Sequence, residues 1–283
     1  MDHRPQAWGR PRDDVYGPYD ASYLSNSGPK QATQSPIVTG TSVLALKFNG
    51  GVVMAADNLA SYGSLARFRD TQRLRSFNGT SLVGFSGDVS DMQYLDRLLT
   101  DLSISETYND STPRAEDDDD DNGDDDDAAS TGRRNNALNA ANLHKYLGKL
   151  MYNRRSKFNP LWNQLLVAGL DDAGAPFLAC ADLRGTTYSA PSLATGYGAA
   201  LAQPLMRRVA ETEEQAAQLT QEAAVAAVRE CMKVLYYRDA RSLDTYSLAV
   251  VTKDGVDIKT DEKLEKQSWA FAERIRGYGT QVV

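Results

Sequence analysis

A glycine–threonine pair, Gly40–Thr41, is followed sixteen residues later by a carboxylate, Asp57. Cleavage after Gly40 would leave Thr41 with a free α-amine beside its hydroxyl, and an N-terminal threonine of this kind is a nucleophile whose own amine serves as the base. If the chain stays intact at this point, the nitrogen of Thr41 is an amide and cannot accept a proton. The pair therefore indicates either a catalytic nucleophile or the remnant of one.

The composition suits one domain of good size or two small ones. The chain has 283 residues, of which 41% are apolar, enough for a packed core. No apolar run reaches the length of a membrane helix, and the first thirty residues hold no signal-peptide segment. Cys180 and Cys231 both lie in apolar surroundings, which predicts two buried thiols in a reducing compartment. With only His3 and His144 in the chain, no metal site is expected.

One short acidic run accounts for the negative charge of the whole chain. Residues 116–127, "EDDDDDNGDDDD", carry one Glu and nine Asp, so the net charge of −7 becomes −7 + 10 = +3 without them. Such a block repels itself and cannot bury apolar surface, which predicts a disordered, solvated insertion over about 110–136. A site for basic partners or cations is the alternative, and with it an acidic binding protein as a further function.

Strand patterns begin directly after the Gly-Thr pair. "SVLALKF", residues 42–48, is followed by Asn49–Gly50, a dipeptide that suits a type I′ turn. "GVVMAAD", residues 51–57, is almost entirely apolar, which predicts a strand covered on both faces. Asn78–Gly79 marks a second hairpin of the same kind.

Helical patterns alternate with these hairpins. Ser90 and Gln93 fit a capping box at the start of a first helix, and further helices are expected from about 137, over 199–211 and over 220–236. The predicted order is two hairpins, two helices, a hairpin, two helices and a hairpin. Hairpins covered by helix pairs predict an α+β protein with two packed sheets and helices outside, a four-layer αββα sandwich.

Four separated motifs resemble one known family. "TGTSVLALKFNGGVVMAADNLASYGSLARF", "GFSGDVSDMQYL", "ATGYGAALAQPL" and "YYRDARSLDTYSLAVVTKDGV" occur in the order found in proteasome β subunits. The likeness covers nearly everything from Thr33 onward except the acidic run. It implies the N-terminal-nucleophile hydrolase fold, which is the same αββα sandwich. The phrases "SYGSLARF" and "GYGAALAQPL" and the ending "GYGTQ" are similar to one branch, which occupies the seventh position of the β ring.

The resemblance also implies roles for individual positions. In active members a threonine freed after a glycine attacks the peptide carbonyl, and Thr41 falls on that nucleophile. The supporting positions are matched by Asp57 for the first Asp, Gly87 for the backbone N–H that serves the oxyanion, and Asp239 and Ser242 for the late Asp and Ser.

Three positions depart from the active pattern. Arg73 replaces the catalytic lysine, and arginine stays protonated and needs more room. Tyr197 replaces a small serine, and Leu243 replaces the glycine expected after Ser242. Catalytic groups must be placed to within about 0.5 Å, so these changes predict that the vestigial site is inactive.

The resemblance divides the chain into three parts. Residues 1–32 are a propeptide-like leader, with cleavage expected between Ala32 and Thr33. That cut would leave eight residues, 33–40, in front of Thr41. Residues 33–265 form the β-type domain. The C-terminal arm, 266–283, would contact the opposite ring through Trp269, Phe271 and Tyr278.

These implications amount to a non-catalytic structural β subunit of the 20S core particle. It would support assembly and the ATP- and ubiquitin-dependent degradation of proteins by the complex. Its partners would be β subunits of the same and the opposite heptameric ring and the α subunits, in the cytoplasm and nucleus. No cofactor, nucleic acid or membrane is implied. The alternative is an active threonine peptidase that uses Thr41.

Overall fold

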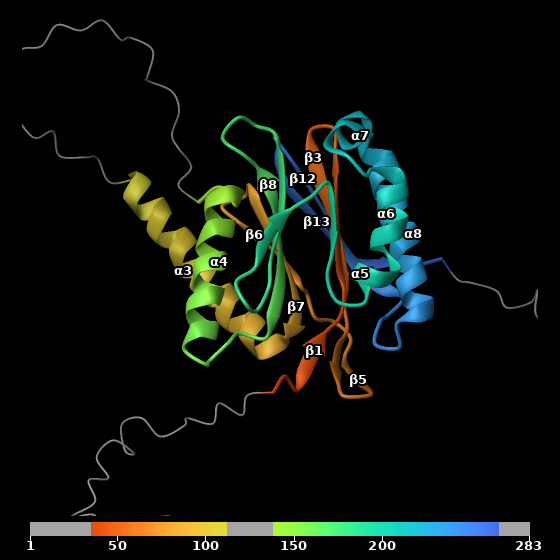
Figure 1. The fold of residues 1–283 in the computed structure, drawn as a ribbon, viewed down its shortest axis with the longest axis horizontal. Coiled ribbons are helices and arrows are strands. Elements are labelled where there is room, and N and C mark those ends of the chain that lie inside the picture. Colours follow the sequence, from red (N-terminus) through yellow and green to blue (C-terminus); the bar gives the residue numbers. More distant parts are fainter. Residues whose placement is uncertain (1–34, 112–137, 266–283) are drawn as a thin grey trace, which may run out of the picture. The chain divides into compact units, whose positions relative to one another are not determined.

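The computed structural model describes residues 35–111 and 138–265 (Figure 1). The chain divides into two units, residues 1–34 and 35–283, and all described residues belong to the second. The predictions for the leader, for cleavage between Ala32 and Thr33, for most of the insertion, and for Trp269, Phe271 and Tyr278 in the C-terminal arm lie outside the described residues.

The described part is built on two antiparallel sheets. The first sheet has the strand order β10-β9-β8-β7-β1-β4-β5, and β6 also pairs with β7. Its strands are β1 (Val38–Gly40), β4 (Ala60–Tyr62), β5 (Leu65–Phe68), β6 (Leu74–Phe77), β7 (Ser81–Asp88), β8 (Asn163–Leu170), β9 (Pro176–Ala181) and β10 (Thr187–Ser189). The second sheet has the order β11-β2-β3-β12-β13. Its strands are β2 (Val43–Phe48), β3 (Gly51–Asp57), β11 (Ser192–Ala194), β12 (Thr245–Thr252) and β13 (Gly255–Lys263).

Helices cover the outer face of each sheet (Figure 1). The first sheet is covered by α3 (Val89–Ser111) and α4 (Ala140–Ser156). The second is covered by α5 (Gly198–Leu201), α6 (Gln203–Val209), α7 (Glu213–Gln218) and α8 (Gln221–Arg238). The four-layer αββα sandwich predicted from the sequence is confirmed. None of the described helices is long and apolar enough to cross a membrane.

Strand β3 shows why the two sheets pack in this way. All seven of its residues are buried. Val52, Met54 and Ala56 face the first sheet, whereas Val53 and Ala55 face the helical layer that contains α8. A strand with apolar side chains on both faces is stable only between two layers, so the prediction for this segment is confirmed. The two thiols, Cys180 and Cys231, are also free and buried as predicted.

The type I′ turn predicted at Asn49–Gly50 is wrong. Such a turn needs a positive φ at both central residues, and here only Gly50 has one, +87°. The amide of Asn49 donates to the carbonyl of Leu219 at 2.9 Å, so a tertiary contact sets the backbone at this position. Asn78 and Gly79 do both have positive φ, 51° and 65°.

The predicted cap of the first helix is also wrong. Helix α3 begins at Val89, one residue before the expected N-cap Ser90. The carboxylate of Asp88 instead accepts a hydrogen bond from the amide of Asp91 at 3.0 Å, and it also accepts from the hydroxyl of Ser90. An aspartate just before a helix is as good a cap as serine, and its charge favours the helix N-terminus.

Two further differences follow from short elements. The helix predicted over 199–211 is two helices, α5 and α6, because Pro204 stands in the first turn of α6 and lacks an N–H for a continuous helix. The hairpin formed by β4 and β5 was not predicted. Its strands have three and four residues and expose Tyr62, Leu65 and Phe68, so they show no clear alternation.

Candidate functional site

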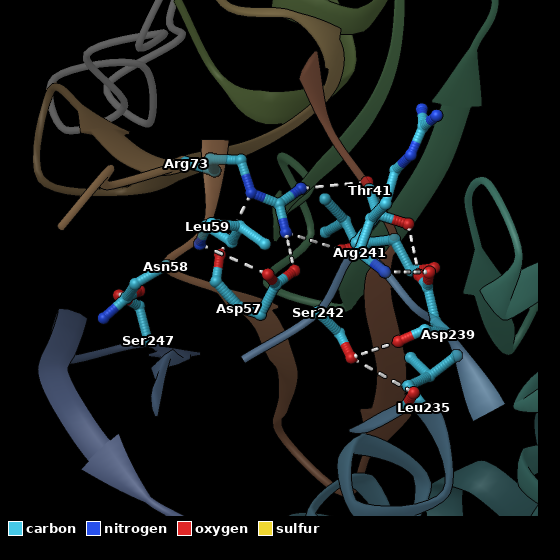
Figure 2. Close-up of polar contacts among 12 residues, drawn as sticks. Thr41, Asp57, Asn58, Leu59, Arg73, Leu235, Asp239, Arg241, Ser242 and Ser247 are labelled. Carbon is cyan, nitrogen blue, oxygen red and sulfur yellow. Dashed lines mark hydrogen bonds and ion pairs between the residues drawn. The ribbon is translucent and has the colours of Figure 1, made fainter. Parts of the chain in front are cut away.

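Thr41, Asp57, Arg73 and Asp239 come together where several elements begin or end (Figure 2). Thr41 lies between β1 and β2, and Asp57 is the last residue of β3. Arg73 directly precedes β6, and Asp239 follows the last residue of α8. Contacts between the two sheets and the end of α8 therefore fix the positions of these side chains.

Arg73 makes five hydrogen bonds and is only 1% exposed. Its Nε donates to the carbonyl of Asp57 at 3.0 Å. Nη1 donates to the carbonyls of Thr41 at 2.9 Å and Phe85 at 3.2 Å. Nη2 donates to the carbonyl of Ser42 at 3.0 Å and to the carboxylate of Asp57. This is the full donor set of an arginine side chain, so the guanidinium has no N–H left for another partner.

Asp57 forms a buried ion pair with Arg73. Its side chain is 2% exposed, and the amide of Leu59 also donates to its carboxylate, at 3.2 Å. Burial raises the pKa of the Asp57 carboxyl to about 6, although Arg73 and the Leu59 amide act in the opposite direction. The pair therefore serves as an internal support between β3 and the segment before β6.

Gly40 makes room for the arginine. A Cβ atom at this position would overlap with Cδ of Arg73 and would lie 2.9 Å from its Nε. The replacement of lysine by the larger arginine thus depends on a glycine immediately before Thr41. The Gly-Thr pair has a packing role here in addition to any role in cleavage.

The hydroxyl of Thr41 is directed at the end of α8. It donates to Oδ2 of Asp239 at 2.5 Å, and Oδ1 of Asp239 accepts from the amide of Arg241 at 2.9 Å. Asp239 is 5% exposed. A carboxylate in this position holds the hydroxyl in one orientation. Thr41 thus contacts Asp239 through its hydroxyl and Arg73 through its carbonyl (Figure 2).

Ser242 has a local structural contact. Its hydroxyl donates to the carbonyls of Asp239 at 2.8 Å and Leu235 at 3.2 Å, and both belong to the C-terminal end of α8. The carbonyl of Leu235 also accepts from the amide of Asp239 at 2.7 Å, so this serine adds a further contact at the end of the helix. The resemblance places Ser242 among the supporting catalytic positions, whereas its hydroxyl hydrogen here is directed at the helix.

Strand β1 fills the space in front of Thr41. Gly40 pairs with Gly87 of β7, and Thr39 pairs with Asp88 of β7 and with Ser61 of β4. Further contacts hold the same segment: the amide of Ile37 donates to Asp88 at 3.3 Å. The nitrogen of Thr41 is therefore an ordinary peptide nitrogen that follows a paired strand.

A cavity of about 470 Å³ lies beside Thr41. Gly87 and Tyr197 line it together with Trp162 and Arg241. Gly87 has a φ of +93°, a conformation that favours glycine. Tyr197 precedes α5, and its side chain is 65% exposed, so the phenol stands at the mouth of the cavity and not in the buried cluster.

The structure thus divides the predicted site residues into two groups. Thr41, Asp57, Arg73 and Asp239 form one connected network, and Ser242 adjoins it through the carbonyl of Asp239. Gly87 and Tyr197 line the cavity beside Thr41. Sequence reasoning missed Ser42, whose hydroxyl accepts from the amide of Gly198 at 2.8 Å. A serine just before an apolar strand gives no sign of such a contact. Among residues 35–111 and 138–265, no three His, Cys, Asp or Glu residues are grouped so that they could hold a metal ion.

Comparison with known proteins agrees with this geometry. The sequence profile of the family described as "Proteasome subunit" matches residues 37–114 and 133–268. The chain is 44% identical to proteasome subunit beta type-7 of Saccharomyces cerevisiae, over 100% of both chains. It is 45% identical to the probable beta type-7 subunit of Schizosaccharomyces pombe, over 98% of this chain and 97% of that protein.

A relative from a vertebrate carries the name beta type-4 instead of beta type-7. Proteasome subunit beta type-4 of Xenopus laevis is 41% identical, over 92% of this chain and 96% of that protein. The phrases quoted from the sequence favour this β type-4 branch, and both names occur among the relatives. With the family profile, the relatives and the αββα sandwich in agreement, the chain belongs to the proteasome family and is a β-type subunit.

Proposed function

We propose that this chain is a structural β subunit of the proteasome core that does not cut peptides itself. Membership of the family implies assembly with other subunits into the proteasome. The observation that carries the absence of catalysis is the pairing of β1 with β4 and β7 directly before Thr41. The saturated hydrogen bonding of Arg73 supports the same conclusion.

Thr41 lacks a base in this arrangement. A hydroxyl nucleophile of this class needs the free α-amine of its own residue to take up the proton. The nitrogen of Thr41 is bonded to Gly40, and Arg73 remains protonated and has no free donor. Asp239 accepts from the hydroxyl of Thr41, but its position fits an orienting contact on the inactive threonine equally well.

The position of β1 would also prevent a peptide substrate from binding. A peptide that approached Thr41 as an extended chain would have to pair with β4 and β7 where β1 lies. Strand β1 already pairs with β4 through Val38 and Thr39, and with β7 through Thr39 and Gly40. Strand β1, Val38–Gly40, would therefore block the binding of a peptide substrate beside Thr41.

The remaining parts of the proposal concern the assembled particle. We place the subunit in the seventh position of the β ring, in contact with β subunits of both rings and with α subunits, in the cytoplasm and nucleus. There it supports assembly and ubiquitin-dependent degradation by the complex. The arm of residues 266–283 would join the two halves of the particle. An active peptidase that uses Thr41 is the alternative, favoured by the retained Gly40, Thr41 and Asp57.

Replacement of Thr41 by alanine tests the absence of catalysis. We expect Thr41→Ala to leave every peptidase activity of the assembled particle unchanged, because the hydroxyl only contacts Asp239. The lost hydrogen bond should cost about 1 kcal/mol of stability. Activities are measured with fluorogenic peptides on purified particles, and Thr39→Ala in β1 is the matched control. Loss of one cleavage activity in Thr41→Ala particles of normal composition would establish the alternative.

The mass of the mature chain provides an independent test. We expect intact-mass spectrometry of the subunit from purified particles to give a chain that starts at Thr33, because the pairing of β1 protects the bond between Gly40 and Thr41. The stub 33–40 would then remain attached. A mature chain starting at Thr41 would free the α-amine, vacate the groove and reject the proposal.

A further inference from the structure

The outer side of α4 is basic along its length. Lys145, Lys149, Arg155 and Lys157 are exposed, and residues 140–157 include no Asp or Glu. None of these four side chains forms an ion pair with another described residue. The helix therefore presents positive charge without compensation from the described part of the chain.

The arrangement along the helix adds to this field. Lys145 and Lys149 are one turn apart and lie on the same face, where like charges repel each other. The N-terminus of α4 already has an anionic neighbour, because the N-cap residue Asn139 donates to the carboxylate of Asp172 at 2.6 Å. An anionic group beside the helix would thus be favoured along the stretch from Lys145 to Lys157.

The chain itself carries a run of anionic residues shortly before α4 in the sequence. Residues 116–127 carry ten negative charges, and they fall in the stretch 115–132 that the proteasome-subunit profile does not match. Leu138 and Asn139 are buried against the fold, and the ten residues 128–137 that connect the run to them can span about 35 Å when extended. Helix α4, residues 140–156, is about 25 Å long. The connection is therefore long enough for the run to reach any part of the basic face.

We propose that residues 116–127 dock on the basic face of α4 in the same chain. The contact would consist of several exposed ion pairs between aspartates and the lysines and arginines of the helix. Exposed pairs are weak and are screened by salt, so the acidic run would bind reversibly to the helix. This inference is independent of whether Thr41 is catalytic.

Carbodiimide coupling, which joins a carboxylate directly to a lysine amine, tests the proposal. Assembled particles that contain the full chain are treated at low and at high ionic strength, and the linked peptides are identified by mass spectrometry. We expect links from residues 116–127 to Lys145 and Lys149. Because exposed charges are screened within about 3 Å at 1 M salt, the yield of these links should fall about fivefold or more. Lys253, exposed in the turn between β12 and β13, is the internal control and should remain unlinked.

Two variants separate docking from chance proximity. Lys145→Glu with Lys149→Glu should increase the rate at which an Asp-specific protease cuts the run. Replacement of its nine aspartates by asparagine leaves only Glu116 to couple, so the links should nearly disappear at either ionic strength. Links from the run to another subunit, or to Lys253 as readily as to α4, would overturn the proposal. So would resistance of Lys145 and Lys149 to a small amine-reactive reagent in the asparagine variant, because another chain would then cover the helix.

Discussion

Arg73→Lys will destabilise the subunit and will not restore peptidase activity, although it returns the residue type found in active relatives to this position. Lysine has three donors, whereas Arg73 serves the carbonyls of Thr41, Ser42, Asp57 and Phe85 and the carboxylate of Asp57. At least two buried acceptors would lose their partner. Each such loss costs about 1 to 3 kcal/mol, so a decrease of about 2 to 5 kcal/mol in the free energy of unfolding is expected.

The measurements are the unfolding midpoint of the full chain and the fraction of particles that contain the variant when it is expressed together with the wild type. Arg75→Lys is the matched control, since Arg75 is two residues away and partly exposed. Its ion pair with Asp96 is weak, because Nε of Arg75 lies 3.7 Å from Oδ2 of Asp96. Its effect should stay within about 0.5 kcal/mol. Equal stability of Arg73→Lys and Arg75→Lys would show that the five hydrogen bonds do not support the fold.

Gly87→Ala is expected to have the second large effect. A Cβ at this position would overlap with the carbonyl oxygen of Trp162 and lie 3.1 Å from its carbonyl carbon. The backbone φ of +93° adds strain for any residue with a side chain. Because Gly87 pairs with Gly40, the displacement would pass to β1. We expect a loss of about 2 to 4 kcal/mol in the free energy of unfolding.

Gly50→Ala separates the two causes of this effect. Gly50 has a similar φ of +87°, but no atom lies within 4 Å of the Cβ that alanine would add. Its substitution therefore measures the backbone strain alone, about 1 kcal/mol. Urea unfolding of the two full-length variants gives the difference. If Gly87→Ala lowers the free energy of unfolding no more than Gly50→Ala does, then the overlap of the added Cβ with the carbonyl of Trp162 has no energetic cost. The predicted steric effect at Gly87 would then be wrong.

The parts of the fold that could be predicted from sequence are those with a strong periodic pattern. The apolar run of β3 required cover on both faces, and the amphipathic helix α8 required a sheet to lie on. These two requirements define the layers. Strands β1, β4 and β5 have three or four residues each and depend on pairing with distant segments. Such pairing leaves no local pattern, and these strands could not be predicted.

The site was predicted as a set of positions but not as a network. Thr41, Asp57 and Asp239 could be placed by resemblance. In the structure, Oγ1 of Thr41 lies 2.5 Å from Oδ2 of Asp239. The partners of Arg73 are mainly backbone carbonyls, which carry no residue signature. The contact of Ser242 with the end of α8 was missed for a related reason, because a short hydroxyl side chain bonds to whatever carbonyl lies nearest.

The dependence of Arg73 on Gly40 has an evolutionary consequence. Arg73 occupies the space above a glycine and bonds to carbonyls of β3, β7 and the connection between β1 and β2, so reversal to lysine alone passes through a less stable protein. A return to catalysis would also require removal of β1 from its groove and a smaller residue at Tyr197. Under the proposed function, recovery of catalysis would therefore require several substitutions together, and the effects of such neighbouring substitutions are coupled.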